Sequence, residues 1–321
     1  PYKPGKPAEE LAREMGHSDV IKLASNENPL GFSGKVSELL LTGKTEFNRY
    51  PDGSGHELKK ALAKKLGVEP NQLTLGNGSN DVLDLITRVV MEPGFEAIIP
   101  EHSFVVYKLS VTCANGEIVV APAASGFGAD LEAVRDRISS KTRLIFIANP
   151  NNPTGTWVGL GEIEKLLLAV PKSVWVVIDE AYFEYLDHPE YGSALFLMER
   201  FENLIITRTF SKIYGLASLR LGYGVTSSRF ADLLNRARQP FNVGGLTLAA
   251  GVAALSDDEF VIESRQKNEE GLRQLEKGLD QLGLSWIPSG GNFLAVDCER
   301  DGQELFRELL KEGVIVRAIG E

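Results

Sequence analysis

The chain has 321 residues, which is long enough for two domains and a large buried core. Hydrophobic residues make up 43% of it and charged residues 24%, which is ordinary for a soluble globular enzyme. A formal net charge of -10 argues against a nucleic acid or an anionic membrane surface as a partner. A local cluster of Arg side chains and backbone N–H groups could still bind a small anionic substrate.

Several kinds of site and segment are not expected. Cys113 and Cys298 lie far apart, so we expect no disulfide framework and interpret both as buried thiols in a reducing compartment. The four histidines lack the spacing of a helical zinc pair, so we expect no metal. No apolar run reaches the roughly 20 residues of a membrane span, and no signal peptide opens the chain, so we expect a cytoplasmic protein. Because the chain starts at Pro1 without Met, we also expect a trimmed N-terminus.

The first part of the chain predicts an arm followed by a helix. Residues 1–41 are rich in Pro and Gly at first and then irregular, so we expect an N-terminal arm that packs against a smaller domain. Residues 54–67 predict a helix that has a capping box at Ser54 and Glu57 and that stops at Gly67.

Strand-like and helix-like segments then alternate up to residue 256. Short runs that are rich in β-branched residues and mostly apolar on both faces predict buried strands at 97–100, 117–121, 143–148, 174–178, 203–207 and 222–226. Helical patterns lie between these runs. The alternation predicts a three-layer α/β domain with a mainly parallel central sheet over residues 42–256.

The pattern changes after residue 256. A long charged helical stretch reaches residue 282, and a strand at 293–297, a helix at 302–312 and a strand at 314–317 follow it. We therefore expect residues 257–321 to form a smaller α+β domain, to which the N-terminal arm contributes.

A lysine motif follows the predicted strand at 203–207. Thr209, Ser211 and Lys212 stand close together, and Arg220 comes eight residues after the lysine. The lysine could form a Schiff base while the two hydroxyls and the arginine hold a phosphate. A surface loop with a solvated lysine explains this motif equally well when it is taken alone.

Polar residues also follow two other predicted core strands. Asp179 ends the strand at 174–178, where a buried carboxylate needs a cationic partner such as a pyridinium N–H, and Tyr182 could donate to a phenolate oxygen. The alternative, an Asp that caps a helix, is favoured for this motif alone. Asn152 lies in a Pro- and Gly-containing turn after the strand at 143–148, and its amide could donate to the same oxygen.

A glycine-containing turn opens the helical pattern that starts near Ser79 and Asn80. Gly76 and Gly78 precede this pattern, and backbone N–H groups at a helix N-terminus favour an anion such as phosphate. The turn lacks the Lys of a phosphate-binding Walker loop and the third Gly of a dinucleotide-binding loop. A capped helix start is the common alternative. Together, however, the four motifs supply every group that pyridoxal phosphate (PLP) needs.

These motifs resemble the fold-type I PLP aminotransferases, and the resemblance covers nearly all of the chain. Within that superfamily the chain is most similar to the histidinol-phosphate aminotransferases. The segments that carry this similarity are Tyr2-Lys3-Pro4-Gly5, Leu23-Ala24-Ser25-Asn26-Glu27-Asn28-Pro29, Asn48-Arg49-Tyr50-Pro51-Asp52-Gly53, Asn151-Asn152-Pro153-Thr154-Gly155, Asp179-Glu180-Ala181-Tyr182, Arg208-Thr209-Phe210-Ser211-Lys212 and Gly313-Val314-Ile315-Val316-Arg317.

The resemblance implies a role for each matching residue. Lys212 would carry the cofactor and shuttle the proton, Asp179 would pair with the ring nitrogen, and Asn152 and Tyr182 would bind the ring oxygen. The cofactor phosphate would be held by Ser79, Asn80, Thr209, Ser211 and Arg220. Phe104 would stack on the ring, and Tyr50 would reach the phosphate of the neighbouring subunit in an obligate homodimer. Substrate contacts would come from Tyr2, Asn28, Asn152 and Arg317.

The implied activity is amino transfer from histidinol phosphate to 2-oxoglutarate, which gives imidazole acetol phosphate and glutamate in histidine biosynthesis. The family normally continues past the point that corresponds to residue 321, so we expect the smaller domain to be truncated. The alternatives are a threonine-phosphate decarboxylase or an aromatic amino-acid aminotransferase on the same scaffold, a PLP-fold binding protein without catalysis, and a nucleotide-binding α/β protein that uses Gly76–Gly78.

Overall fold

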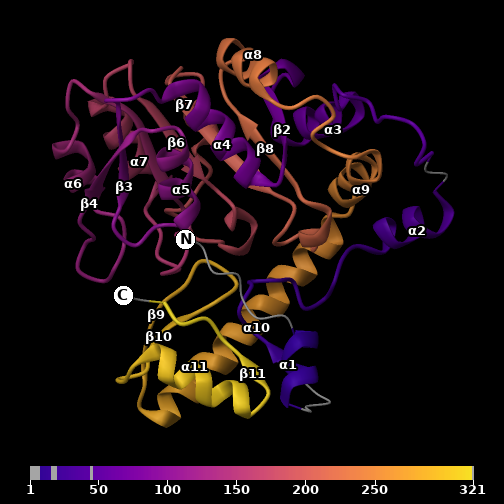
Figure 1. The fold of residues 1–321 in the computed structure, drawn as a ribbon, viewed down its shortest axis with the longest axis vertical. Coiled ribbons are helices and arrows are strands. Elements are labelled where there is room, and N and C mark those ends of the chain that lie inside the picture. Colours follow the sequence, from indigo (N-terminus) through magenta and orange to yellow (C-terminus); the bar gives the residue numbers. More distant parts are fainter. Residues whose placement is uncertain (1–7, 16–19, 44–45, 320–321) are drawn as a thin grey trace.

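The computed structural model describes residues 8–15, 20–43 and 46–319. They form a large α/β unit and a smaller unit, and the long helix α10 (Asp258–Leu282) runs from one to the other (Figure 1). Within these residues, no helix combines the length and the apolar character needed to cross a membrane.

A seven-stranded sheet forms the centre of the large unit, in the order β2-β8-β7-β6-β5-β3-β4. Its strands are β2 (Leu73–Asn77), β3 (Glu96–Pro100), β4 (Glu117–Ala121), β5 (Thr142–Ala148), β6 (Trp175–Asp179), β7 (Leu204–Thr209) and β8 (Leu221–Val225). Neighbouring strands are parallel except in the two pairs that β8 forms, with β2 and with β7. The predicted α/β fold with a mainly parallel sheet is therefore confirmed, and the carboxyl ends of β5, β6 and β7 meet at one edge.

Helices cover both faces of this sheet. The helices of the large unit are α3 (His56–Leu66), α4 (Ser79–Val90), α5 (Val105–Cys113), α6 (Leu131–Asp136), α7 (Leu160–Ala169), α8 (Ser228–Ala237) and α9 (Gly245–Leu255). Strand β5 shows how the layers form, because Ile145 and Ile147 pack towards α6 and α7 while Leu144 and Phe146 pack towards α4, α5 and α8. Short 3₁₀ turns lie at Pro70–Gln72, Phe183–Tyr185, Ala194–Leu197 and Ala217–Leu219.

The smaller unit combines both ends of the described chain. It contains α1 (Ala8–Met15), β1 (Ile21–Lys22), β9 (Ser285–Ile287), β10 (Ala295–Asp297), α11 (Gly302–Lys311) and β11 (Val314–Ile315). Strand β1 pairs in parallel with β11, and Leu11, Ala24 and Ile315 form a small core there. Helix α2 (Gly34–Thr42) packs instead on α9 of the large unit. The domain boundaries at residues 41/42 and 256/257 remain a proposed division.

Several local predictions were wrong. The helix expected from residue 54 begins at His56, and Asp52 rather than the Ser54–Glu57 box accepts from the N–H groups of Ser54 and His56. The stop at Gly67 is confirmed, since this residue has a left-handed backbone with φ 70°. Within the predicted arm at 1–41, the described residues are less irregular than expected, because they form α1, β1 and most of α2.

The other errors concern burial and missed strands. Strand β4 lies at the edge of the sheet and is largely exposed instead of buried on both faces. Cys113 is exposed and Cys298 is only partly covered, so the expectation of two buried thiols was also wrong. Strands β1, β2 and β9 were not predicted, because β1 and β9 are very short and Gly76 interrupts the apolar pattern of β2.

Candidate active site

Lys212 lies in the loop that follows β7. Its Nζ donates to the backbone oxygens of Ser25 (3.3 Å) and Asn26 (3.4 Å). Burial lowers the pKa of Lys212 to about 8, although Glu27 and Asp179 act in the opposite direction. The N-terminal segment can come this close because Gly215 has no side chain; a Cβ there would lie 1.7 Å from the oxygen of Gly31.

Asp179 ends β6 and is almost completely buried. The Tyr107 hydroxyl donates to its Oδ2 (2.7 Å) and the Thr207 hydroxyl to its Oδ1 (2.9 Å). Burial raises the pKa of Asp179, while these two hydrogen bonds act to lower it. Neither hydroxyl carries a positive charge, so neither would balance the charge of an ionised carboxylate.

Tyr182 lies just after β6, and its hydroxyl is the meeting point of two amides. Asn26 donates to this oxygen at 3.0 Å and Asn152 at 3.2 Å. Burial raises the pKa of Tyr182, so the phenol keeps its hydrogen. The Lys212 Nζ lies 5.4 Å from the centre of the Tyr182 ring. The structure therefore brings together Lys212, Tyr182 and Asn152, as predicted from the sequence.

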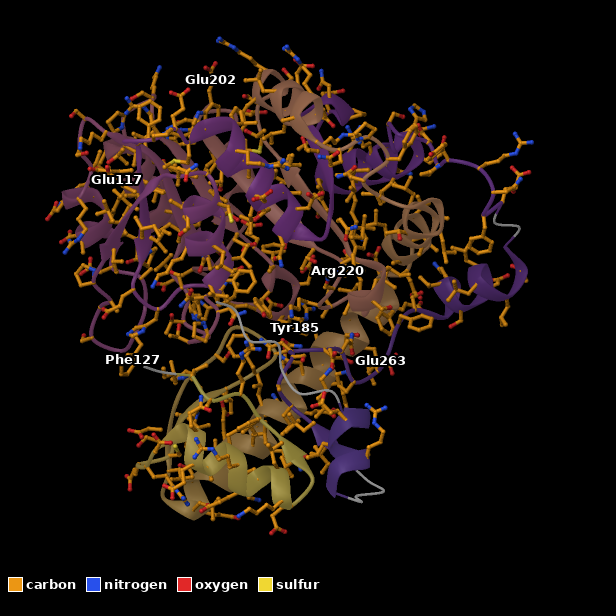
Figure 2. All side chains as sticks on the ribbon, in the orientation of Figure 1. Glu117, Phe127, Tyr185, Glu202, Arg220 and Glu263 are labelled. Atoms are coloured by element: carbon orange, nitrogen blue, oxygen red, sulfur yellow. The ribbon has the colours of Figure 1, made fainter. Side chains whose placement is uncertain are left out.

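A cradle of groups that can bind an anion forms where α4 begins. Arg220 donates to the Ser211 hydroxyl (3.1 Å), and a Cβ on Gly78 would lie only 2.5 Å from the Arg220 Nη2. Ser79 is the first residue of α4, and a Cβ on Gly222 would lie 2.1 Å from its backbone nitrogen. In Figure 2, Arg220 lies on the side of the large unit that faces α10. An arginine, a hydroxyl and a helix N-terminus are suited to a phosphate.

The remaining cofactor residues of the prediction lie around these groups. Thr209 is buried at the end of β7, where its hydroxyl accepts from the backbone N–H of Ser211 (3.1 Å). Asn80 is partly buried in the first turn of α4. Phe104 lies at the start of α5, edge-on to Tyr107 with 5.8 Å between ring centres, and so stands next to the tyrosine that contacts Asp179.

The family model for aminotransferases of class I and II matches residues 18–321. The chain belongs to this family. It is 52% identical to histidinol-phosphate aminotransferase 2 of Pseudomonas aeruginosa, over 99% of this chain and 87% of that protein. It is 53% identical to histidinol-phosphate aminotransferase 2 of Methylococcus capsulatus, over 100% of this chain and 88% of that protein.

Solved aminotransferase structures share this fold. The crystal structure of histidinol-phosphate aminotransferase from Sinorhizobium meliloti, in complex with pyridoxal 5'-phosphate, matches with a TM-score of 0.92 and 29% identity, over 99% of this chain and 88% of that one. A Thermus thermophilus aspartate aminotransferase variant matches with a TM-score of 0.84 and 26% identity, over 96% of this chain and 85% of that one. The expected fold-type I PLP transferase fold is thus confirmed.

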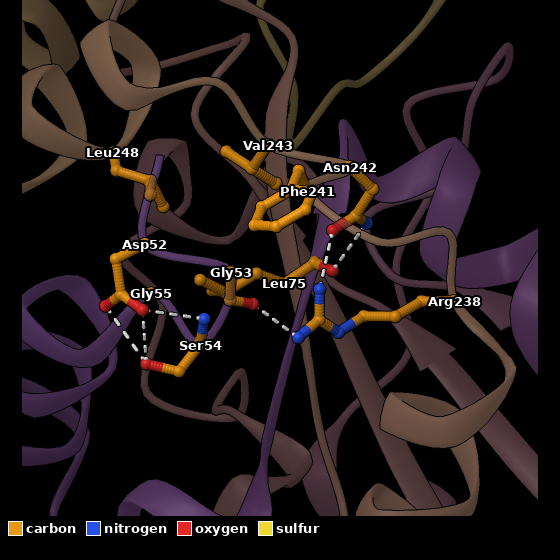
Figure 3. A pocket seen from close by; sticks show the side chains of 10 residues that line it. All are labelled: Asp52, Gly53, Ser54, Gly55, Leu75, Arg238, Phe241, Asn242, Val243 and Leu248. Atoms are coloured by element: carbon orange, nitrogen blue, oxygen red, sulfur yellow. Dashed lines mark hydrogen bonds between the residues drawn. The ribbon is translucent and has the colours of Figure 1, made fainter. Parts of the chain in front are cut away.

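Tyr50 stands apart from the other predicted site residues of this aminotransferase. Its side chain is 83% exposed and stacks on Phe241, with 4.8 Å between ring centres. Phe241 lines a small pocket (Figure 3), beside which Arg238 donates to the oxygen of Gly53 and to Asn242. These contacts connect the loop that follows Tyr50 to the segment before α9. The role of Tyr50 at the cofactor of a neighbouring subunit stays a prediction.

The predicted substrate residues have different positions. The side-chain amide of Asn28 forms hydrogen bonds within the protein: its Nδ2 donates to the backbone oxygen of Ile213 (2.8 Å) and to the Ser264 hydroxyl (2.9 Å). Arg317 is exposed after β11 in the smaller unit. Tyr2 lies outside the described residues. A substrate contact for each of them stays a prediction.

The sequence reasoning missed several residues that support this aminotransferase site. Tyr107 and Thr207 hold Asp179, and Asn26 contacts Tyr182. A buried ion pair joins Arg208 to Glu180 at 2.7 Å, one residue after Asp179. Tyr107 could have been noticed only as an aromatic in an apolar helix, since its partner lies 72 positions away. The adjacent Glu180 and Arg208 were visible inside the quoted motifs but were given no role.

Proposed function

We propose that the chain is a PLP-dependent aminotransferase that converts histidinol phosphate and 2-oxoglutarate to imidazole acetol phosphate and glutamate, a step in histidine biosynthesis. The observation that carries the proposal is the meeting of Lys212, Asp179 and Tyr182 at one edge of the sheet. The two histidinol-phosphate aminotransferases named above, whose sequences are 52% and 53% identical to this one over nearly the whole chain, support the same substrate.

The residues present fit the cofactor. Asp179 would meet the ring nitrogen, Tyr182 and Asn152 the ring oxygen, and the cradle of Arg220, Ser211, Ser79, Asn80 and Thr209 the phosphate. The close approach of Arg220 to Gly78 supports this fit, because any larger residue at position 78 would fill the cradle. Phe104 would cover one face of the ring. When bound, pyridoxal phosphate supplies an electron sink for negative charge that develops on the substrate.

Lys212 would do the proton chemistry. Its burial lowers its pKa to about 8, so a useful fraction of the amine is neutral near neutral pH and can accept a proton at Nζ. The same Nζ would take the proton from the substrate carbon that bears the amine and would deliver it to the cofactor carbon that accepts the amino group. The backbone oxygens of Ser25 and Asn26 would hold the amine in place between these transfers.

A homodimer with shared sites completes the proposal. Tyr50 is highly exposed, and so are Phe47 (85%) and Leu41 (87%), which lie close to it in sequence. Exposed aromatic and aliphatic side chains of this kind are suited to a protein interface. In the dimer, Tyr50 would reach the phosphate of the partner's cofactor. Arg317, Asn28 and Tyr2 would contact the substrate, and the enzyme would act in the cytoplasm.

A substrate panel tests this proposal. The holoenzyme would be given 2-oxoglutarate with histidinol phosphate, an aromatic amino acid or threonine phosphate, while glutamate and CO₂ are measured. Histidinol phosphate should give the highest kcat/KM for glutamate formation. CO₂ release from threonine phosphate, or faster turnover of the aromatic amino acid, would replace the proposed substrate with one of the alternatives. Lys212→Ala should remove turnover with every substrate and serves as the control.

A further inference from the structure

Asn26 belongs to the N-terminal segment that crosses the active site and contacts three groups there. Its Nδ2 donates to the Tyr182 hydroxyl at 3.0 Å. Its backbone oxygen accepts from the Lys212 Nζ at 3.4 Å and from the Asn292 Nδ2 at 3.1 Å. One residue of the arm therefore touches two of the three predicted catalytic side chains, Lys212 and Tyr182, and a side chain of the smaller unit.

The backbone of Asn26 is in the left-handed region, with φ 52°. Residues other than Gly are uncommon in this region, and Asn tolerates it better than most. Such a conformation persists when surrounding contacts hold it, and it often marks a functional position. Here it allows the carbonyl group to meet Lys212 while the amide of the same residue meets Tyr182.

The contacts of Tyr182 determine where its hydrogen can go. A tyrosine hydroxyl has one hydrogen to donate and two lone pairs that can accept. Asn26 and Asn152 each donate to the oxygen, which occupies both lone pairs. Because two N–H groups face the oxygen, its own hydrogen must point to a third group.

We propose that Asn26 is a positioning residue that, together with Asn152, makes Tyr182 a hydrogen-bond donor to the ring oxygen of the bound cofactor. Asn292 fixes Asn26 from the smaller unit, where the neighbouring Phe293 lies edge-on to Tyr182 with 5.2 Å between ring centres. This inference rests on the proposed PLP-dependent function and adds a residue of the N-terminal arm to it.

Two substitutions separate the amide of Asn26 from its backbone role. Asn26→Gly keeps the left-handed backbone but removes the donor, and Asn26→Asp keeps the shape but offers Tyr182 an acceptor in place of a donor. Asn115→Gly is the matched control, since Asn115 has φ 56° and is exposed at the end of α5. Each protein would be loaded with PLP, and the pH midpoint of its visible absorption change would be measured with kcat and KM.

Donation from Tyr182 stabilises negative charge on the ring oxygen. This oxygen shares a proton with the Lys212 nitrogen that carries the cofactor, and the donation makes that proton easier to remove. Asn26→Gly should therefore raise the pH midpoint and lower kcat about fivefold, with KM changed less than about twofold, as expected for one lost hydrogen bond. Asn26→Asp should raise the midpoint and lower kcat further, because Tyr182 then donates to the carboxylate. Asn115→Gly should match the wild type.

Three results would overturn the inference. The first is an unchanged midpoint and kcat in both Asn26 variants, with only the thermal unfolding temperature lowered, because Asn26 would then merely anchor the arm. The second is an equal effect of Asn115→Gly. The third is a wild-type protein that binds no PLP, which would refute the proposed function itself and this inference with it. If Asn26→Gly does not fold, the midpoint of Asn26→Asp alone decides.

Discussion

Replacing Lys212 with Met should stabilise the protein without cofactor at neutral pH. The ammonium of Lys212 is largely buried, and burial lowers its pKa from 10.5 to about 8. The folded state therefore binds the proton of Lys212 more weakly than the unfolded chain does, and this difference lowers the unfolding free energy. The gap between the two pKa values corresponds to about 3 kcal/mol of unfolding free energy at pH 7. Loss of the two long hydrogen bonds to Ser25 and Asn26 offsets about 1 kcal/mol of this gain.

The pH dependence identifies the cause. Well below pH 8 Lys212 is charged in both states, so the cost of its burial is fully present. Between pH 8 and 10.5 the folded protein loses the proton while the unfolded chain keeps it, so the unfolding free energy of the wild type rises with pH. The advantage of Lys212→Met should therefore shrink by about 2 kcal/mol between pH 7 and pH 9.5.

Urea unfolding of both proteins without cofactor, from pH 6.5 to 9.5, measures this difference. Lys60→Met, on the exposed side of α3, is a matched control whose effect should not change over this range, because its ammonium is already in water. A Lys212→Met advantage that stays constant with pH, or a destabilised variant at pH 7, would refute the argument from burial.

The other predictions concern activity. Asp179→Asn should keep the fold but lose most of kcat, since an amide cannot balance a protonated ring nitrogen; near-wild-type turnover would contradict this role. Tyr107→Phe should raise the pKa of Asp179 further and lower kcat several-fold at similar KM, and the ¹⁵N shift of labelled cofactor should move towards a neutral ring; an unchanged shift would leave Tyr107 as packing only. Lys212→Ala mixed with Tyr50→Ala under subunit exchange should recover roughly a quarter of wild-type activity, because random assortment gives one intact site in each mixed dimer. If Tyr50 served its own subunit, no activity would return.

The large unit could be predicted because its signals are local. Strands β5, β6 and β7 are apolar on both faces, and a polar residue such as Asp179 marks where β6 ends. Since parallel strands end at the same edge, the position of this site follows from the strand order. Lys212 was found for the same reason, as a lysine just after a buried strand.

The rest depends on contacts between distant segments. Asn26 meets Tyr182 across 156 positions, and no local pattern indicates this contact. The start of α3 was misplaced because Asp52 and Ser54 are both good helix caps, and only the path of the chain decides between them. Strand β4 looked like a core strand, but at the edge of the sheet its apolar residues remain partly exposed.

A single-turnover reaction tests the proposed function most directly. Histidinol phosphate would be added to the holoenzyme without 2-oxoglutarate, while the visible absorption of the cofactor and the keto product are followed. We predict that the absorption band is lost as one product forms per active site, and that 2-oxoglutarate then restores the band. Lys212→Ala should show neither change. A wild-type holoenzyme whose band is unchanged by histidinol phosphate, but is lost with another amino donor, would contradict the account.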